Sequence, residues 1–143
     1  MAEYVKDVMT PGVVAVRPDA SLVEAAQSMR TQNIGGVVVA EGQDVIGVLT
    51  DRDIAVRAVA DGLDPATVSV QSVCTRNPVT VTPEDRVATA VALMREHAVR
   101  RLPVVENGLP VGIVSLGDLA EAEDPASALA DISRAEPDGP TGA

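Results

Sequence analysis

Aromatic side chains are almost absent from this chain of 143 residues. It has no Phe, no Trp and a single Tyr, Tyr4, although 46% of its residues are hydrophobic. The apolar content is therefore almost entirely Ala, Val, Leu and Ile, enough for one compact domain or two small halves that share a core. Stacking on aromatic rings, a usual way to hold single-stranded nucleic acid, is excluded. A flat ligand must be held by aliphatic side chains and backbone.

Basic residues, cysteine and histidine are also scarce. The 11 basic residues face 21 acidic ones, a net charge of −10, so the chain lacks the overall basic surface that nucleic acids or anionic membranes require. The one cysteine, Cys74, excludes an internal disulfide and suits a reducing compartment. His97 is the only histidine, which gives a metal site little support, and we interpret it as a surface residue at a helix end.

Long apolar runs are missing as well. No stretch approaches the roughly 18 apolar residues of a membrane span, and the N-terminus shows no signal-peptide pattern. We therefore predict a cytoplasmic protein with neither nucleic acid nor membrane as a partner.

An internal repeat is the main feature that is present. Residues 5–54 align without a gap on residues 70–119, an offset of 65. Identical pairs include Thr10/Thr75, Pro18/Pro83, Met29/Met94, Gly47/Gly112 and Asp53/Asp118. A repeat of this length is a structural unit, and two copies predict a pseudo-two-fold arrangement with paired sites.

Each copy reads as strand, helix, strand, strand, helix. The first helix of copy one has a capping box at Ser21–Glu24 and an apolar stripe, and Gly35–Gly36 is expected to end it. In copy two, Asp85 is the expected helix cap. The predicted strands are 13–16, 37–39 and 45–49 in copy one, and 79–81, 102–105 and 111–114 in copy two.

These patterns predict an α/β (α+β) fold of two β-α-β-β-α repeats packed sheet-to-sheet with pseudo-two-fold symmetry. We place repeat 1 at residues 1–64, repeat 2 at 65–122 and a tail at 123–143. The tail is expected to form a short helix, with Leu129 and Ile132 docking on the core, and to be disordered beyond Ala135. Clefts between the halves are the expected ligand sites.

Both copies resemble the CBS (cystathionine β-synthase) domain, and the tandem resembles a Bateman module. The resemblance covers about residues 4–122. It is carried by four segments in the family's order: Val5-Lys-Asp-Val-Met-Thr-Pro11, Gly47-Val-Leu-Thr-Asp-Arg-Asp53, His97-Ala-Val-Arg-Arg-Leu-Pro-Val-Val105 and Gly112-Ile-Val-Ser-Leu-Gly-Asp118. It implies a regulatory module that binds adenosine derivatives and dimerises through its helices.

The resemblance also implies how each ligand site is assembled from both copies. One site would combine Thr50 and Asp53 with Arg100, Arg101 and the segment from Thr75 to Val79. The other would combine Ser115 and Asp118 with the segment from Thr10 to Val14 and with Gly35–Gly36. Because only the first site has an arginine pair, we predict that it is the better phosphate site. Candidates for an adenine slot are Val13, Val14, Val38, Pro78, Val79 and Pro103.

Each of these residues has a structural alternative. An Asp carboxylate can accept hydrogen bonds from both ribose hydroxyls beside a helix N-terminus that favours phosphate. Thr-x-x-Asp and Ser-x-x-Asp equally fit capping boxes that only start helices. The arginines fit ion pairs in an acidic chain, and the valines and prolines fit core packing.

We consider three functions for this chain, of which the sequence favours two. The first is a ligand sensor that binds AMP, ADP, ATP, NAD or a similar adenine nucleotide and signals through a homodimer to an unknown protein partner. The second is a ligand-free interaction module that acts through its dimer surface. An enzyme is not expected, because the sequence shows no acid–base pair, Cys–His arrangement or Walker-type loop, and no resident cofactor or metal is expected.

Overall fold

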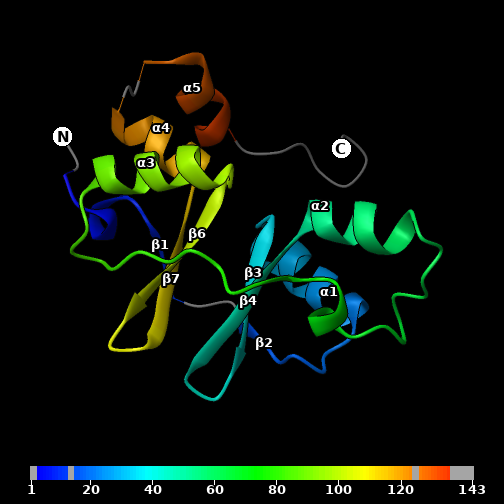
Figure 1. Cartoon of the computed structure of the whole chain (residues 1–143). Helices are drawn as coiled ribbons and strands as arrows, with labels where there is room; N and C mark the ends of the chain where they lie inside the picture. Colours follow the sequence, from blue (N-terminus) through cyan, green and yellow to red (C-terminus); the bar gives the residue numbers. More distant parts are fainter. Residues whose placement is uncertain (1–2, 13–14, 124–125, 136–143) are drawn as a thin grey trace.

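The computed structural model describes residues 3–12, 15–123 and 126–135 and shows two halves built alike (Figure 1). The first half contains β2 (Ala15–Val16), α1 (Leu22–Gln32), β3 (Gly36–Glu41), β4 (Asp44–Thr50) and a helix that is α-helical as α2 (Asp51–Asp53) and π-helical as η2 (Ile54–Val59). The second half contains α3 (Val87–His97), β6 (Arg101–Glu106), β7 (Leu109–Ser115) and α4 (Leu116–Glu123), and α5 (Ala128–Arg134) follows it. The chain is thus a mixed α/β protein with two repeats, as predicted.

Helix α1 forms where the sequence predicts it. The Glu24 backbone N–H donates to the Ser21 side chain at 3.1 Å, and the helix buries Leu22, Ala25 and Met29 along one stripe. The prediction that Gly35–Gly36 ends the helix is wrong. The helix ends at Asn33, which adopts φ 54°, because a short polar side chain tolerates the left-handed conformation well enough to replace glycine there.

Two antiparallel hairpins form the centre of the molecule. Strand β3 pairs with β4 and β6 pairs with β7, each around a turn containing a glycine with positive φ, Gly42 or Gly108. In Figure 1 the two hairpins lie next to each other, with α1 and α2 flanking the first and α3 and α4 flanking the second. Strands β4 and β7 contact each other where the halves meet. Sheet-to-sheet packing therefore leaves the helices outside.

The segment that begins each repeat crosses to the other half. The N-terminal 3-10 turn η1 (Val5–Asp7) and β1 (Thr10–Pro11) join the second half, where β1 pairs with β7. The turn η3 (Val70–Ser72) and β5 (Thr75–Arg76) join the first half, where β5 pairs with β4. The halves are therefore interlocked rather than joined by a simple linker.

Matching hydrogen bonds fix both crossing segments. The Val5 N–H donates to the Asp85 carbonyl at 2.8 Å, and the Val70 N–H donates to the Ala20 carbonyl at the same distance. Both donors and both acceptors are 65 positions apart, so the two bonds occupy equivalent places in the two repeats. The pseudo-two-fold relation thus extends to single hydrogen bonds.

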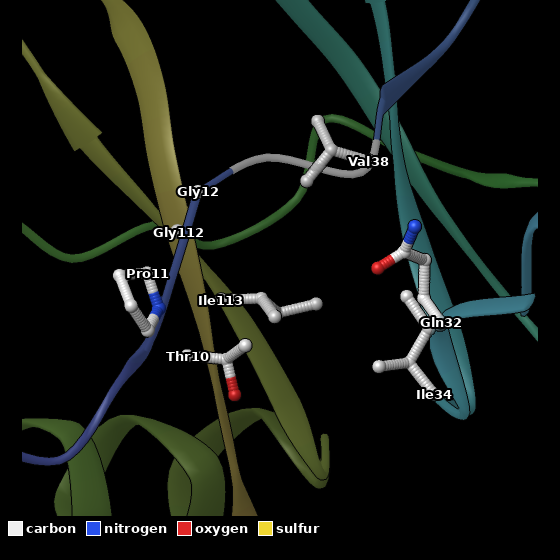
Figure 2. Close-up of a pocket in the computed structure, with 9 residues that line it drawn as sticks. Thr10, Pro11, Gly12, Gln32, Ile34, Val38, Gly112 and Ile113 are labelled. Atoms are coloured by element: carbon white, nitrogen blue, oxygen red, sulfur yellow. The ribbon is translucent and has the colours of Figure 1, made fainter.

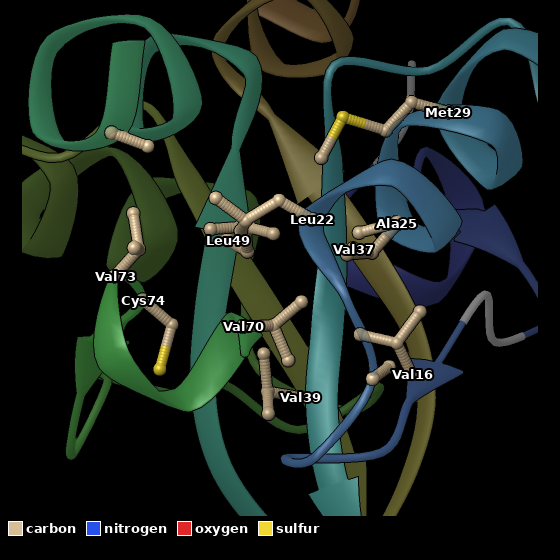
Figure 3. Packing of buried hydrophobic residues seen from close by; sticks show 12 residues of the cluster. Val16, Leu22, Ala25, Met29, Val37, Val39, Leu49, Val70, Val73 and Cys74 are labelled. Carbon is tan, nitrogen blue, oxygen red and sulfur yellow. The ribbon is translucent and has the colours of Figure 1, made fainter. Parts of the chain in front are cut away.

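Each half has its own core, completed by the crossing segment of the other repeat. Figure 3 shows the first core, in which Val70, Val73 and Cys74 pack with Leu22, Leu49 and their neighbours. In the second core, Val5 packs with buried residues that include Val87, Met94, Leu102 and Val114. Burial of the crossing segments holds the two halves together.

The start of the second repeat differs from the prediction at two points. The strand expected at 79–81 is reduced to one bridge, in which Val81 pairs with Val104. Arg86 rather than Asp85 is the N-cap of α3, without a side-chain bond, because the Asp85 carboxylate accepts the Thr82 N–H at 2.9 Å instead. Asp85 therefore closes the preceding turn.

Helix α5 packs on α4 differently from the prediction. Among the α5 residues whose burial is described, Ala130 is buried, whereas Leu129 and Ile132 are 43% and 71% exposed. A small residue lets the two helices approach, and this turns the larger side chains outward. The expected helix start at residues 124–125, the strand residues 13–14 and the tail beyond Ala135 lie outside the described residues.

Candidate functional site

The larger cleft of the molecule lies between the two halves and has a volume of about 920 Å³. Its walls come from the end of β4 and the start of α2, from the segment after β5, from the end of α3 and the start of β6, and from the junction of β7 with α4. The lining residues are Val48, Thr50–Asp53, Thr75, Asn77–Val79, His97–Arg101 and Ser115–Gly117. This volume lies within the range of about 300–1,000 Å³ that is usual for small-molecule sites.

A smaller pocket of about 100 Å³ occupies the pseudo-symmetric position (Figure 2). It is lined by Thr10–Gly12, Gln32, Ile34, Gly36, Val38, Gly112 and Ile113. Adding 65 to Thr10, Gln32, Ile34 and Gly36 gives Thr75, His97, Val99 and Arg101, all of which line the larger cleft. The repeat therefore made two equivalent sites that now differ about ninefold in volume.

The predicted site residues fall unevenly between these two cavities. Thr50, Asp53, Thr75, Val79, Arg100 and Arg101 all line the larger cleft, and Thr10 lines the smaller pocket. Of the residues predicted for the second site, Thr10 and Gly36 line the smaller pocket, Ser115 lines the larger cleft, and Asp118 lines neither of these two cavities. Val14 lies outside the described residues.

The candidate Asp residues form two capping boxes. The Asp53 N–H donates to Thr50 Oγ1 at 3.1 Å, and Asp53 Oδ2 accepts the Thr50 N–H at 2.9 Å. The same pair of bonds joins Ser115 and Asp118, at 3.1 and 2.8 Å. Oδ2 of each carboxylate thus accepts the N–H of the helix N-cap residue, and Oδ1 takes no part in the capping box.

The second oxygen of Asp53 already faces a cation. Arg57 Nε lies 3.7 Å from Asp53 Oδ1, and Arg57 Nη1 donates to the Val73 carbonyl at 3.1 Å. Asp53 is also only 9% exposed. A ligand hydroxyl that binds Asp53 Oδ1 would lie beside Arg57, a side chain that also holds the crossing segment.

The Asp118 carboxyl lies in an environment that disfavours its charge. Burial raises the pKa of the Asp118 carboxyl above its ordinary value of 3.8, while hydrogen bonds from Ser115 and the charge of Arg101 act in the opposite direction. The capping box of Ser115 and Asp118 therefore holds a carboxylate that burial makes costly to ionise.

Arg101 crosses from the second half to the first. Its side chain lies against Gly35 and Gly36, the residues at the matching positions of the first repeat. A methyl group on Gly36 would lie 2.9 Å from Arg101 Cδ, so a larger residue there would displace the arginine. The glycine pair therefore makes room for a guanidinium between the halves.

The sequence reasoning did not single out several of the lining residues, and Arg52 and His97 are the two with ionisable side chains of basic type. Arg52 stands inside the segment Gly47–Asp53, between the two residues that were singled out, and it lines the cleft with them. His97 is an exposed residue at the end of α3, as interpreted from the sequence, and it also lines the cleft. The signal for both was available, because each lies in a segment that carries the family resemblance.

Metal and membrane sites find no support in the part of the chain that the structure describes. No three His, Cys, Asp or Glu residues in residues 3–12, 15–123 and 126–135 gather in a way that could hold a metal ion. Among the same residues, no helix combines the length and apolarity needed to cross a bilayer.

Comparisons with known proteins agree with this architecture. The CBS domain family model matches residues 5–59 and 70–124. The chain is similar to the CBS domain-containing protein YhcV of Bacillus subtilis, with 43% identity over 133 residues that cover 90% of this chain and 94% of YhcV. It is also similar to Hypoxic response protein 1 of Mycobacterium tuberculosis, with 36% identity over 116 residues, 80% of this chain and 81% of that protein.

Solved structures share the fold. The crystal structure of Hypoxic Response Protein I with two coordinated zinc ions superposes with a TM-score of 0.74 at 34% identity, covering 82% of this chain and 97% of that one. The CBS domain pair of protein MJ0100, in complex with 5′-methylthioadenosine and S-adenosylmethionine, gives a TM-score of 0.79 and covers 89% of this chain and 100% of that one. Its identity of 23% establishes a common fold and no more.

Proposed function

Because the chain belongs to the CBS domain family and carries two CBS domains in tandem, we propose that it is a cytoplasmic regulatory module that binds an adenine nucleotide in the larger cleft. The observation that carries this proposal is the convergence of Thr50, Thr75, Val79, Arg100 and Arg101, from both halves, on one cleft of about 920 Å³. The smaller pocket, at about 100 Å³, is below the size range of ligand sites. The proposal therefore assigns one nucleotide to each chain.

The roles of the lining residues follow from their chemistry. The guanidinium groups of Arg100 and Arg101 can bind phosphate oxygens in the two-pronged geometry that suits them. Val79 and Val48 offer aliphatic surfaces for the base, and the Thr50 and Thr75 hydroxyls offer hydrogen bonds to ribose. AMP, ADP, ATP and NAD share these features, and the module binds them without chemical turnover.

The output of the proposed module runs through a homodimer to a separate protein partner. Helix η2 follows Asp53 directly, and its Val56 and Val59 are 47% and 63% exposed. Exposed valines on a helix that starts at the ligand cleft suit a surface whose packing responds to binding. Occupancy alters the signal only if the ligand prefers one packing arrangement over another.

The alternative is a module that binds no nucleotide and acts through its surface. The capping boxes favour it, since Asp53 and Asp118 are each accounted for by a helix N-terminus. In that case the cleft results from the duplication and binds no nucleotide, and the exposed helix residues bind the partner.

A thermal-shift screen separates the two. The melting temperature of the purified protein is measured with AMP, ADP, ATP, NAD, S-adenosylmethionine or cyclic di-AMP. Each ligand is added over a range of concentrations that reaches about 100 times the dissociation constant of a binding ligand. A true ligand stabilises the fold by about 2.7 kcal/mol at that ratio. The proposal expects a shift that Arg100→Ala removes and that Arg95→Ala, an exposed arginine outside the cleft, retains. Absence of any shift would favour the ligand-free module.

A further inference from the structure

The only aromatic residue of the chain, Tyr4, lies in a cluster of charges on the first crossing segment (residues 3–11). Lys6 Nζ and Arg86 Cζ each lie 5.6 Å from the centre of the Tyr4 ring, within the range of a cation–π contact. Lys6 also pairs with Glu84 at 3.0 Å, and Arg86 pairs with Glu3. Each cation beside the ring is therefore held by a carboxylate as well. We call these five residues the charge cluster.

The charge cluster attaches the first crossing segment to the second half. Both ion pairs join the segment to residues 84–86, just ahead of α3. Arg86 is available for this contact because its side chain makes no capping bond, although Arg86 is the N-cap of α3. Within the segment, Val5 is fully buried in the second core. The cluster thus surrounds the place where the segment enters that core.

The second crossing segment (residues 68–76) lacks these charges at the matching positions. Adding 65 to Glu3, Tyr4 and Lys6 gives Val68, Ser69 and Gln71, which are uncharged. Arg57 does hold the second segment, but its guanidinium donates to a backbone carbonyl and not to a carboxylate there. The charged side chains of the cluster expose about half of their surface, so dissolved ions screen their pairs. Added salt should therefore weaken the attachment of the first segment more than that of the second.

We infer that the first crossing segment is a strap held by charge, which the cluster keeps closed over the second core and which rising ionic strength opens locally. The second crossing segment stays closed under the same conditions. One exposed ion pair contributes little to such a contact, but two pairs that share one ring form a network in which each member fixes the next. Opening of the strap exposes Val5, so salt controls access to the second core alone. This inference goes beyond the proposed function and does not depend on nucleotide binding.

Matched backbone amides report the state of the two segments. The Val5 and Val70 N–H groups each donate at 2.8 Å to a carbonyl of the half that receives the segment. The Lys6 and Gln71 N–H groups do the same at 3.0 and 3.1 Å. The members of each pair are 65 positions apart, so the second segment is an internal control in the same molecule and the same buffer.

The test is amide hydrogen exchange of the full chain, followed by NMR at about 20 mM and about 500 mM sodium chloride. The added salt is expected to speed exchange at Val5 and Lys6 about fivefold relative to Val70 and Gln71. The ratio between the two segments removes the effect of salt on the exchange chemistry and on the global stability of an acidic protein.

Two variants assign the effect to the charge cluster. Arg86→Gln removes the cation that contacts both Glu3 and Tyr4, so it should speed exchange at Val5 about threefold at low salt and reduce the salt effect to about twofold. Arg17→Gln is the matched control, because it breaks an exposed ion pair of the first half. It is expected to leave exchange at Val5 and its salt effect unchanged.

The result that would overturn the strap is an equal response of the two segments to salt, since both would then open together in global unfolding. A salt effect at Val5 that Arg86→Gln leaves unchanged, or that Arg17→Gln reduces equally, would show that the cluster does not hold the segment. Unchanged exchange at Val70 and Gln71 in each variant shows that the rest of the fold is intact.

Discussion

Gly47 and Gly112 occupy matching positions in the two repeats, and each lies under the crossing segment of the other. A methyl group on Gly47 would lie 2.5 Å from the Thr75 carbonyl oxygen and 2.9 Å from Cys74 Sγ. A methyl group on Gly112 would lie 2.6 Å from the Thr10 carbonyl oxygen. Neither glycine has a positive φ, so alanine is excluded by space and not by backbone conformation.

Gly47→Ala should therefore destabilise the protein, and the loss of unfolding free energy can be estimated. Strand β5 pairs with β4 at Gly47↔Arg76 and Val48↔Thr75, so the obstructing carbonyl cannot retreat without weakening that pairing. Overpacking of this kind costs about 1–3 kcal/mol. At about 3 °C per kcal/mol for a chain of this size, the melting temperature should fall by about 3–9 °C.

Urea denaturation followed by circular dichroism measures this change, with Gly36→Ala as the matched control. Gly36 is also crowded, but by the flexible side chain of Arg101, which can move. Its free energy of unfolding should change by less than about 1 kcal/mol. Alanine in place of an unconstrained glycine stabilises by about 0.4–1 kcal/mol. If Gly47→Ala raised the free energy of unfolding, or if Gly47→Ala and Gly36→Ala lowered it equally, the close approach of the crossing segment to Gly47 would be refuted.

Three further outcomes are expected. Thr50→Ala and Ser115→Ala should each cost about 1 kcal/mol of unfolding free energy through the lost cap, whereas Thr50→Ser should retain it in chemical denaturation. Val5→Ala should cost about 2 kcal/mol by the same assay, because Val5 is fully buried in the second core. Since burial raises the pKa of Asp118, the folded state binds its proton more tightly than the unfolded chain, and stability should fall as pH rises from about 3.8 through the raised pKa. Melting of Asp118→Asn from pH 4 to pH 7 should show this fall reduced.

Local elements were predictable because their signals are local. The apolar stripe of α1, the Ser21 cap and the β-branched runs of β3 and β4 each lie within a short stretch of sequence, and the structure confirms them. The two-fold relation was predictable because the 65-residue offset is visible without any structure. The sequence left two interpretations for Thr50/Asp53 and Ser115/Asp118, which were ligand contact and helix capping. The structure shows that both pairs form capping boxes.

The crossing of the segments was not predictable from these patterns. Val5 and Val70 look like ordinary apolar residues at the start of a repeat, and nothing nearby in the sequence indicates which core receives them. The strand predicted at 79–81 failed for a related reason. Its apolar pattern is real, but hydrogen bonding to β6 extends only to Val81, so the segment ahead of it lines the cleft instead.

The two cavities illustrate how a duplicated fold becomes asymmetric. The backbones of the repeats match down to single hydrogen bonds, so the two sites began as equivalents. They now differ at a few side chains: Gly35 and Gly36 correspond to Arg100 and Arg101, and Gly117 corresponds to Arg52. Each exchange places a cation on the larger cleft. Of the matching glycines, Gly36 lines the smaller pocket and Gly117 lines the larger cleft. Arg101 needs Gly35 and Gly36 opposite it for room. The glycines of one repeat and the arginines of the other therefore form one feature, and changing either should alter the same site.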